Sequence, residues 1–244
     1  MSNAPKVAVI YCPCTGTVHE LAQAIASGAE AGGAEVRIRN VAELAPRDAI
    51  TSNPAREARA SSSTRRISRA TLDDVVWADA IIFGGTAGFG DTADQLKRYI
   101  DTLGGLWAQG RLADKVYSGF TADSTARGGR EPTLLALYNT VRHFGGIIVT
   151  PGYTGPVGFA DGIPYDTSQV GGQGSDSPDD TTRAAAAFQG ERVARLTAGF
   201  KIGLATGRNR GAGNDLPDGP SASVAEVLGQ PHELRSEPLD QGGT

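Results

Sequence analysis

The sequence is short of aromatic residues, cysteines and long apolar runs. Aromatic side chains make up 6% of the 244 residues, against 33 glycines, which predicts long loops. The chain has two cysteines, too few for a structural zinc site, and Cys12 and Cys14 are too close in the sequence for an ordinary disulfide. No apolar run reaches the roughly 18 residues that span a bilayer, and no hydrophobic signal segment opens the chain. We therefore expect a cytoplasmic protein without a metal site and without membrane insertion.

The charge pattern argues against a nucleic-acid partner. The formal net charge is -4, and Lys and Arg do not gather on one face of a predicted helix. Arginines within residues 56–69 are separated by serine and alanine, which is typical of a solvated loop.

The first forty residues predict a strand, a helix and a second strand. Residues 6–11 form a short apolar run typical of a strand buried on both faces of a parallel sheet. Leu21 and Ile25 then recur at helical spacing before Gly32 and Gly33, which favour a helix end. Residues 34–40 predict the second strand, so the crossover between the two strands is expected to be right-handed.

The same alternation continues along the chain. It predicts strands at 79–85, 115–120 and 146–150 and helices at 92–103, 132–144 and 181–200. These elements predict a flavodoxin-like, doubly wound, three-layer αβα fold with a five-stranded parallel sheet in the order 2-1-3-4-5. We expect this domain to cover residues 1–200, with 201–244 a disordered tail because glycine, proline and polar residues dominate there.

Three loops leave the carboxyl ends of neighbouring strands in this order: 12–18, 85–91 and 121–130. Ligands of open parallel sheets bind at this edge, where the strand order reverses. The first loop places hydroxyl groups and backbone N–H groups at a helix N-terminus, which suits a phosphate group, although Thr15 or Thr17 capping the helix explains the same residues. His19 is expected to lie at the surface or to cap the helix.

Several segments of the sequence resemble the NAD(P)H:quinone oxidoreductases of the WrbA type, which are FMN-binding flavodoxin-like proteins. They are TGTVHELAQAI at 15–25, DAIIFGG at 79–85, LGGLWAQGRLADKVYSGF at 103–120, and GGIIV followed by PGY at 145–153. The resemblance covers roughly residues 5–200 and implies an FMN-dependent, two-electron reduction of a quinone by NADH or NADPH, with ping-pong hydride transfer. It also implies a homo-oligomer, a tetramer in that family.

The resemblance assigns roles to individual residues. It implies that the FMN phosphate is held by Pro13, Cys14, Thr15, Gly16, Thr17 and Val18. It implies that one side of the flavin ring is lined by Ala87, Gly88, Phe89, Gly90 and Asp91. Ribityl and ring contacts are implied for Asp123, Ser124, Thr125, Ala126, Arg127 and Gly128. His143 is implied to lie beside the flavin, and Trp107 to form the pocket in which the quinone or nicotinamide stacks.

Several positions depart from that family's pattern, among them Pro13, Gly88, Arg127 and Arg130. Pro13 replaces a serine of the phosphate loop and so removes a hydroxyl and an amide donor, and Gly88 replaces an arginine. These changes favour an alternative function, a cofactor-free flavodoxin-like paralogue that acts as a binding or assembly subunit.

Overall fold

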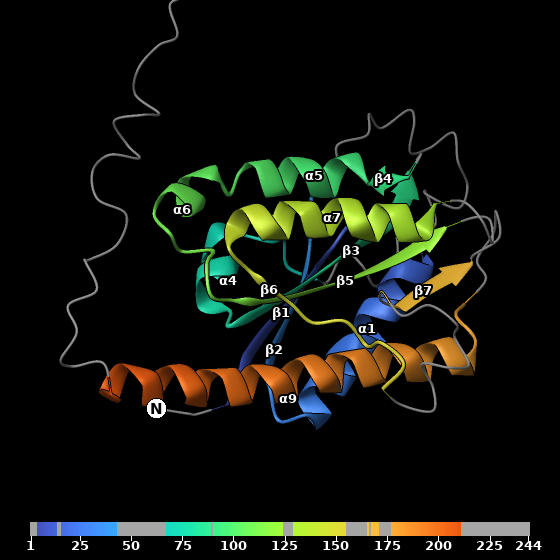
Figure 1. Cartoon of the computed structure of the whole chain (residues 1–244). Helices are drawn as coiled ribbons and strands as arrows, with labels where there is room; N and C mark the ends of the chain where they lie inside the picture. Colours follow the sequence, from blue (N-terminus) through green and yellow to red (C-terminus); the bar gives the residue numbers. More distant parts are fainter. Residues whose placement is uncertain are drawn as a thin grey trace, which may run out of the picture.

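A parallel sheet forms the centre of the protein in a computed structural model of the chain (Figure 1). The structure describes residues 4–13, 16–42, 67–88, 90–123, 129–154, 165, 167–170 and 177–210. Neighbouring strands of the sheet follow the order β2-β1-β3-β5-β6, and all of these pairs are parallel. The strands are β1 (Lys6–Tyr11), β2 (Glu35–Asn40), β3 (Ala80–Gly88), β5 (Val116–Asp123) and β6 (Ile147–Ile148). Taken in chain order, this is the predicted order 2-1-3-4-5, and the predicted fold class is confirmed.

Two short strands extend the sheet at its carboxyl edge and were not predicted. β4 (Asp91–Thr92) pairs antiparallel with the end of β3, and β7 (Thr167–Val170) pairs parallel with the end of β5. Both are too short to show a period of two in the sequence, so only the tertiary structure reveals them.

Helices cover both faces of the sheet, as Figure 1 shows. One face packs against α1 (Gly16–Ala31) and α9 (Asp180–Arg210). The other face packs against α4 (Leu72–Trp77), α5 (Asp94–Asp101), α6 (Gly104–Ala108) and α7 (Arg130–Phe144). The described part of the chain therefore has the three layers that the sequence predicted.

Strand β1 shows why its sequence is apolar throughout. Val7, Val9 and Tyr11 belong to the core beneath α1 and α9, whereas Ala8 and Ile10 belong to the opposite core. Each of these side chains is fully buried. A strand between two helical layers buries both of its faces, and an alternating pattern would place polar groups in one core.

Glycine allows α1 and α9 to cross closely. A methyl group on Gly28 would lie 1.9 Å from the carbonyl oxygen of Ala187, and one on Gly190 would lie 1.9 Å from that of Ile25. Each helix thus presents a glycine to the backbone of the other. The close packing of helix α9 depends on these two positions.

Some element boundaries differ from the sequence prediction. The helix predicted at 92–103 is the shorter α5, and neither α4 nor α6 was predicted. Helix α9 continues to Arg210, so the predicted domain end at residue 200 falls inside it, and residues 211–244 lie outside the described part. Lys201 helps to hold this extension, because its Nζ pairs with Asp79 Oδ2 at 2.6 Å.

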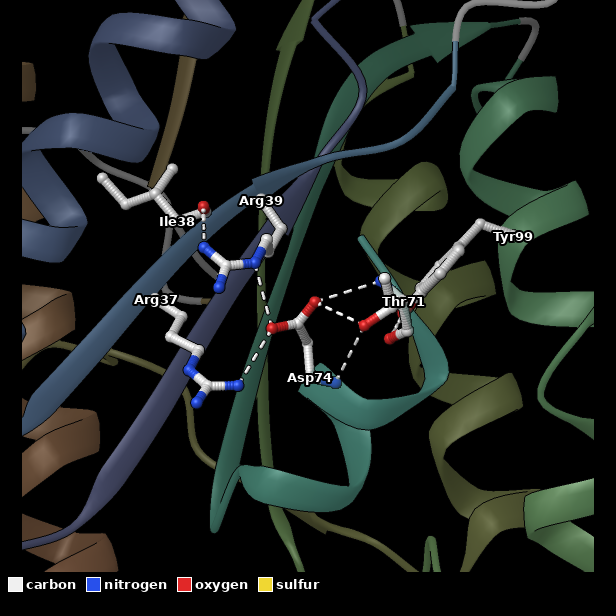
Figure 2. A network of polar contacts seen from close by, with 6 residues as sticks. All are labelled: Arg37, Ile38, Arg39, Thr71, Asp74 and Tyr99. Carbon is white, nitrogen blue, oxygen red and sulfur yellow. Dashed lines mark hydrogen bonds and ion pairs between the residues drawn. The ribbon is translucent and has the colours of Figure 1, made fainter. Parts of the chain in front are cut away.

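A buried carboxylate joins β2 to α4 (Figure 2). Asp74 Oδ1 accepts from Arg39 Nε at 3.0 Å and from Arg37 Nη1 at 3.2 Å, while Oδ2 accepts from the backbone N–H and the hydroxyl of Thr71. Burial acts to raise the pKa of Asp74, but the Thr71 hydrogen bonds and the charges of the arginines outweigh it and lower the pKa. The network fixes the return of the chain to the sheet after residue 67.

None of the helices in the described ranges is both long enough and apolar enough to cross a bilayer.

Candidate functional site

The ends of β1, β3 and β5 lie side by side at one edge of the sheet. Tyr11 is paired with Gly84, and Gly84 with Phe120, while the backbone N–H of Cys12 donates to Gly84 O at 2.9 Å. Farther along, the Thr121 hydroxyl donates to Gly85 O at 3.0 Å. The turns that follow these strands therefore start from adjacent points, as predicted from the strand order.

The turn after β3 folds back as a tight hairpin. Ala87 pairs with Thr92 and Gly88 with Asp91, and Gly90 has a φ of 79°, a conformation that favours glycine. A methyl group placed on Gly88 would meet no described atom within 4 Å. Among the described residues, therefore, none crowds Gly88.

The hairpin contacts the segment that leads into α7. A methyl group on Gly129 would lie 3.1 Å from Gly90 Cα, and the Thr133 hydroxyl donates to Asp91 O at 3.2 Å. Gly129 itself has a φ of 93°, a left-handed conformation that favours glycine. Glycine at this position therefore allows both this conformation and the close approach to Gly90. The turns after β3 and β5 thus meet, with no large side chain between them at Gly90 and Gly129.

Strand β7 borders the same edge on the side of β5. Arg130 Nη1 donates to Ser168 Oγ at 3.0 Å, which joins the start of α7 to β7. The buried side chain of Gln189 on α9 accepts from Thr167 N at 2.9 Å and donates to Ser118 Oγ at 2.9 Å. This amide holds β7 beside β5, because it bonds to both strands.

Helix α1 starts at the end of β1, with its N-terminus at the carboxyl edge of the sheet. The first N–H groups of a helix have no partner within the helix, and they carry the positive end of its dipole. The first turn of α1 contains no acidic residue. No carboxylate of this turn therefore competes with an anion for these groups.

His19 lies in the first turn of α1, and the expectation of a surface or capping role is wrong. Its side chain is 7% exposed, and Nδ1 lies 2.7 Å from the hydroxyl of Tyr11. Burial lowers the pKa of His19, against the smaller opposing charge of Glu20, so the imidazole is neutral at neutral pH. No pattern in the sequence indicates this pair, because the contact depends on how β1 turns into α1.

The predicted cofactor residues fall into two groups. Those that the structure describes lie at the carboxyl edge: Pro13, Gly16, Thr17, Val18, Ala87, Gly88, Gly90, Asp91 and Asp123. The others lie outside the described residues: Cys14, Thr15, Phe89, Ser124, Thr125, Ala126, Arg127 and Gly128.

His143 and Trp107 lie together at the opposite edge of the sheet. Trp107 Nε1 donates to the backbone oxygen of His143 at 2.8 Å, and both side chains are exposed, Trp107 by 42%. Helix α7 starts at the carboxyl edge with Arg130 and ends beside β6, which pairs with the first residues of β5. At 1.5 Å per residue, His143 lies about 20 Å along the helix from Arg130. Within one chain, the structure does not bring these two residues to the ends of β1, β3 and β5.

The cysteine expectation also needs correction. Cys12 is disulfide-bonded, although the spacing of the two cysteines led us to expect no ordinary disulfide. Cys14 lies outside the described residues.

The strand order and the helix at the end of β1 define a doubly wound α/β protein of the flavodoxin-like class. More particularly, the chain belongs to the NADPH-dependent FMN reductase family, whose model matches residues 5–158. An NAD(P)H dehydrogenase (quinone) of Deinococcus radiodurans is 40% identical over 169 residues, which cover 69% of this chain and 84% of that protein. One of Geotalea daltonii is 39% identical over 207 residues, covering 82% and 99%.

Solved structures show the same fold. The flavodoxin, WrbA-like protein from Agrobacterium tumefaciens superposes with a TM-score of 0.58 at 22% identity, covering 81% of this chain and 99% of that one. A flavodoxin from the domain Archaea gives a TM-score of 0.52 at 15% identity.

Proposed function

We propose that this chain is an FMN-dependent NAD(P)H dehydrogenase (quinone), which carries out the two-electron reduction of quinones. Membership of the FMN reductase family and relatives named NAD(P)H dehydrogenase (quinone) support this function. The observation that carries it is that the ends of β1, β3 and β5 and the N-terminus of α1 lie together at one edge of the sheet. Ligands of open parallel sheets bind at this edge, and FMN is such a ligand.

The first turn of α1 suits the phosphate of FMN. Gly16 and Thr17 begin the helix, where backbone N–H groups and the dipole favour an anion, and no acidic side chain opposes it. Pro13 supplies no N–H group, so the proposed phosphate contacts come from the helix rather than from the start of the loop.

The hairpin after β3 suits one side of the flavin ring. The open space around Gly88 and the glycine at position 90 let the backbone of the hairpin approach a flat ligand closely. We propose contacts for Ala87 and Asp91 on this side, and for Asp123 at the end of β5. The protein binds and orients the cofactor, and FMN, when bound, supplies the redox chemistry between NAD(P)H and quinone, so no side-chain nucleophile is required.

We further propose a homo-oligomer, with the tetramer as the state that the resemblance implies. Trp107 and His143 lie at the edge of the sheet opposite the proposed FMN site of their own chain. Their proposed roles, His143 beside the flavin and Trp107 beneath the substrate, therefore require the FMN site of another copy. Light scattering tests the mass against multiples of 25.2 kDa. A monomer with full activity would contradict this arrangement.

Titration of the apo-protein with FMN tests the proposed function, followed by an assay of menadione-dependent oxidation of NADH and NADPH. Saturable FMN binding with quinone-dependent turnover is expected. The matched variant carries Pro13→Ser and Gly88→Arg; no described atom lies within 4 Å of a methyl group placed on Gly88. A hydrogen bond that Pro13→Ser restores to the charged phosphate would strengthen binding by about 1.5–3 kcal/mol, and Gly88→Arg returns a positive charge to the proposed ring side of the site.

Colourless protein that ignores added FMN would contradict the proposal. If the double variant alone bound FMN, the result would favour the cofactor-free paralogue, because the two departures would then explain the loss.

A further inference from the structure

A buried hydrogen bond connects the end of β1 to the first turn of α1. Tyr11 is the last residue of β1 and is fully buried, and its hydroxyl lies 2.7 Å from Nδ1 of His19. The two ring centroids are 5.9 Å apart. The bond therefore joins β1 to the first helical turn, from which the proposed phosphate contacts arise.

Both partners of this bond are neutral at neutral pH. Burial raises the pKa of the Tyr11 hydroxyl far above its usual range and lowers the pKa of His19. A neutral phenol and a neutral imidazole make one hydrogen bond in either tautomer of the ring. A charged imidazole at this position would also oppose the positive end of the α1 dipole.

The residue after His19, just past the first turn of α1, contacts residues at the start of α9. Glu20 accepts from Arg183 Nη2 at 3.0 Å and from the Ser177 hydroxyl at 2.8 Å, and Arg183 also pairs with Asp180. The start of α1 is thus joined inward to β1 through His19 and outward to α9 through Glu20. Of these groups, Glu20 is the charge that opposes the lowering of the His19 pKa.

We propose that His19 is a positioning residue for the cofactor phosphate, which it orients by fixing, with Tyr11, the first turn of α1 against the end of β1. This role rests on the proposed FMN function. The position of the turn matters more in this chain because Pro13 removes an amide donor and leaves the phosphate to the helix. The phosphate contribution to affinity should therefore fall when the bond is removed.

Comparison of FMN with riboflavin isolates that contribution, because the two ligands differ only in the phosphate group. Apo-protein of the wild type and of Tyr11→Phe, His19→Leu and the double variant is titrated with each ligand. Each variant should bind FMN about tenfold more weakly, the size of a misdirected hydrogen bond to a charged group, with riboflavin affinity unchanged. The double variant should be no weaker than the weaker single variant, since one bond is lost in all three.

Two further variants separate positioning from general stability. His19→Asn retains a polar group near Nδ1 and should recover most of the FMN affinity. Tyr117→Phe removes another buried hydroxyl, one that donates to Leu112 O at 2.8 Å at the amino edge of the sheet, and should leave both affinities unchanged. Tyr11→Phe removes a single oxygen atom, so it keeps the test available if His19→Leu does not fold.

The outcomes distinguish the positioning role of His19 from the proposed FMN function on which it rests. A wild type that binds neither FMN nor riboflavin would overturn both. A wild type that binds FMN, with an FMN-to-riboflavin ratio that stays the same in Tyr11→Phe and His19→Leu, would overturn the positioning role alone.

Discussion

Substitution of Gly190 by alanine tests how closely α9 packs on α1. The added methyl group would lie 1.9 Å from the carbonyl oxygen of Ile25, about 1.5 Å inside ordinary van der Waals contact, which starts at 3.4 Å. The obstructing atom belongs to the backbone of α1, so no side chain can turn away. The helices must separate, and α9 must lose part of its contact with the core.

The expected magnitude follows from two opposing effects. Overpacking costs about 1–3 kcal/mol, and we expect the upper end because backbone atoms collide; alanine in place of glycine gains about 1 kcal/mol of helix propensity. The net loss is about 2 kcal/mol. Gly199→Ala lies on the same helix, and its added methyl group meets no described atom within 4 Å. This variant should therefore gain the helix propensity of alanine, about 1 kcal/mol, without a cost of overpacking.

Urea unfolding followed by far-UV circular dichroism measures both variants. The free energies of unfolding should differ by about 3 kcal/mol, with Gly199→Ala the more stable. Gly28→Ala should resemble Gly190→Ala, because it meets Ala187 O at the same distance. Equal stability of Gly190→Ala and Gly199→Ala would refute the close crossing of the two helices.

Two further predictions concern charged groups. Asp74→Asn should lower the free energy of unfolding by about 2–3 kcal/mol, because it leaves two partly buried arginines without their carboxylate. Asp94→Asn breaks an exposed pair with Arg98 and should change the free energy of unfolding by less than about 0.5 kcal/mol. Urea titrations compare the two, and similar losses would contradict the account of Figure 2. The lowered pKa of His19 stabilises the fold above the unfolded-state value of 6.5, and this contribution is lost as the pH falls from there toward the folded-state value. The urea midpoint of the wild type should therefore decrease between about pH 7 and pH 5 more than that of His19→Leu, and parallel curves would count against a neutral buried imidazole.

The order of the sheet could be predicted from local patterns. The run at 6–11 and the glycine pair at 32–33 mark a strand and a helix end without reference to the rest of the chain, and a chain of alternating strands and helices has few topologies open to it. The meeting of three strand ends follows from that order alone. The sequence therefore determined the fold class and the edge of the sheet at which we propose the FMN site.

Only the tertiary structure decided which side chains reach that edge. The length and direction of α7 place His143 at the far side of the sheet, and the turn from β1 into α1 brings His19 onto Tyr11. Helix periodicity shows which residues share a face but not what that face meets, since the partner comes from distant parts of the chain. The crossing at Gly28 and Gly190 has the same cause: a glycine in a helix is unfavourable by itself, and its reason lies in the backbone of the neighbouring helix.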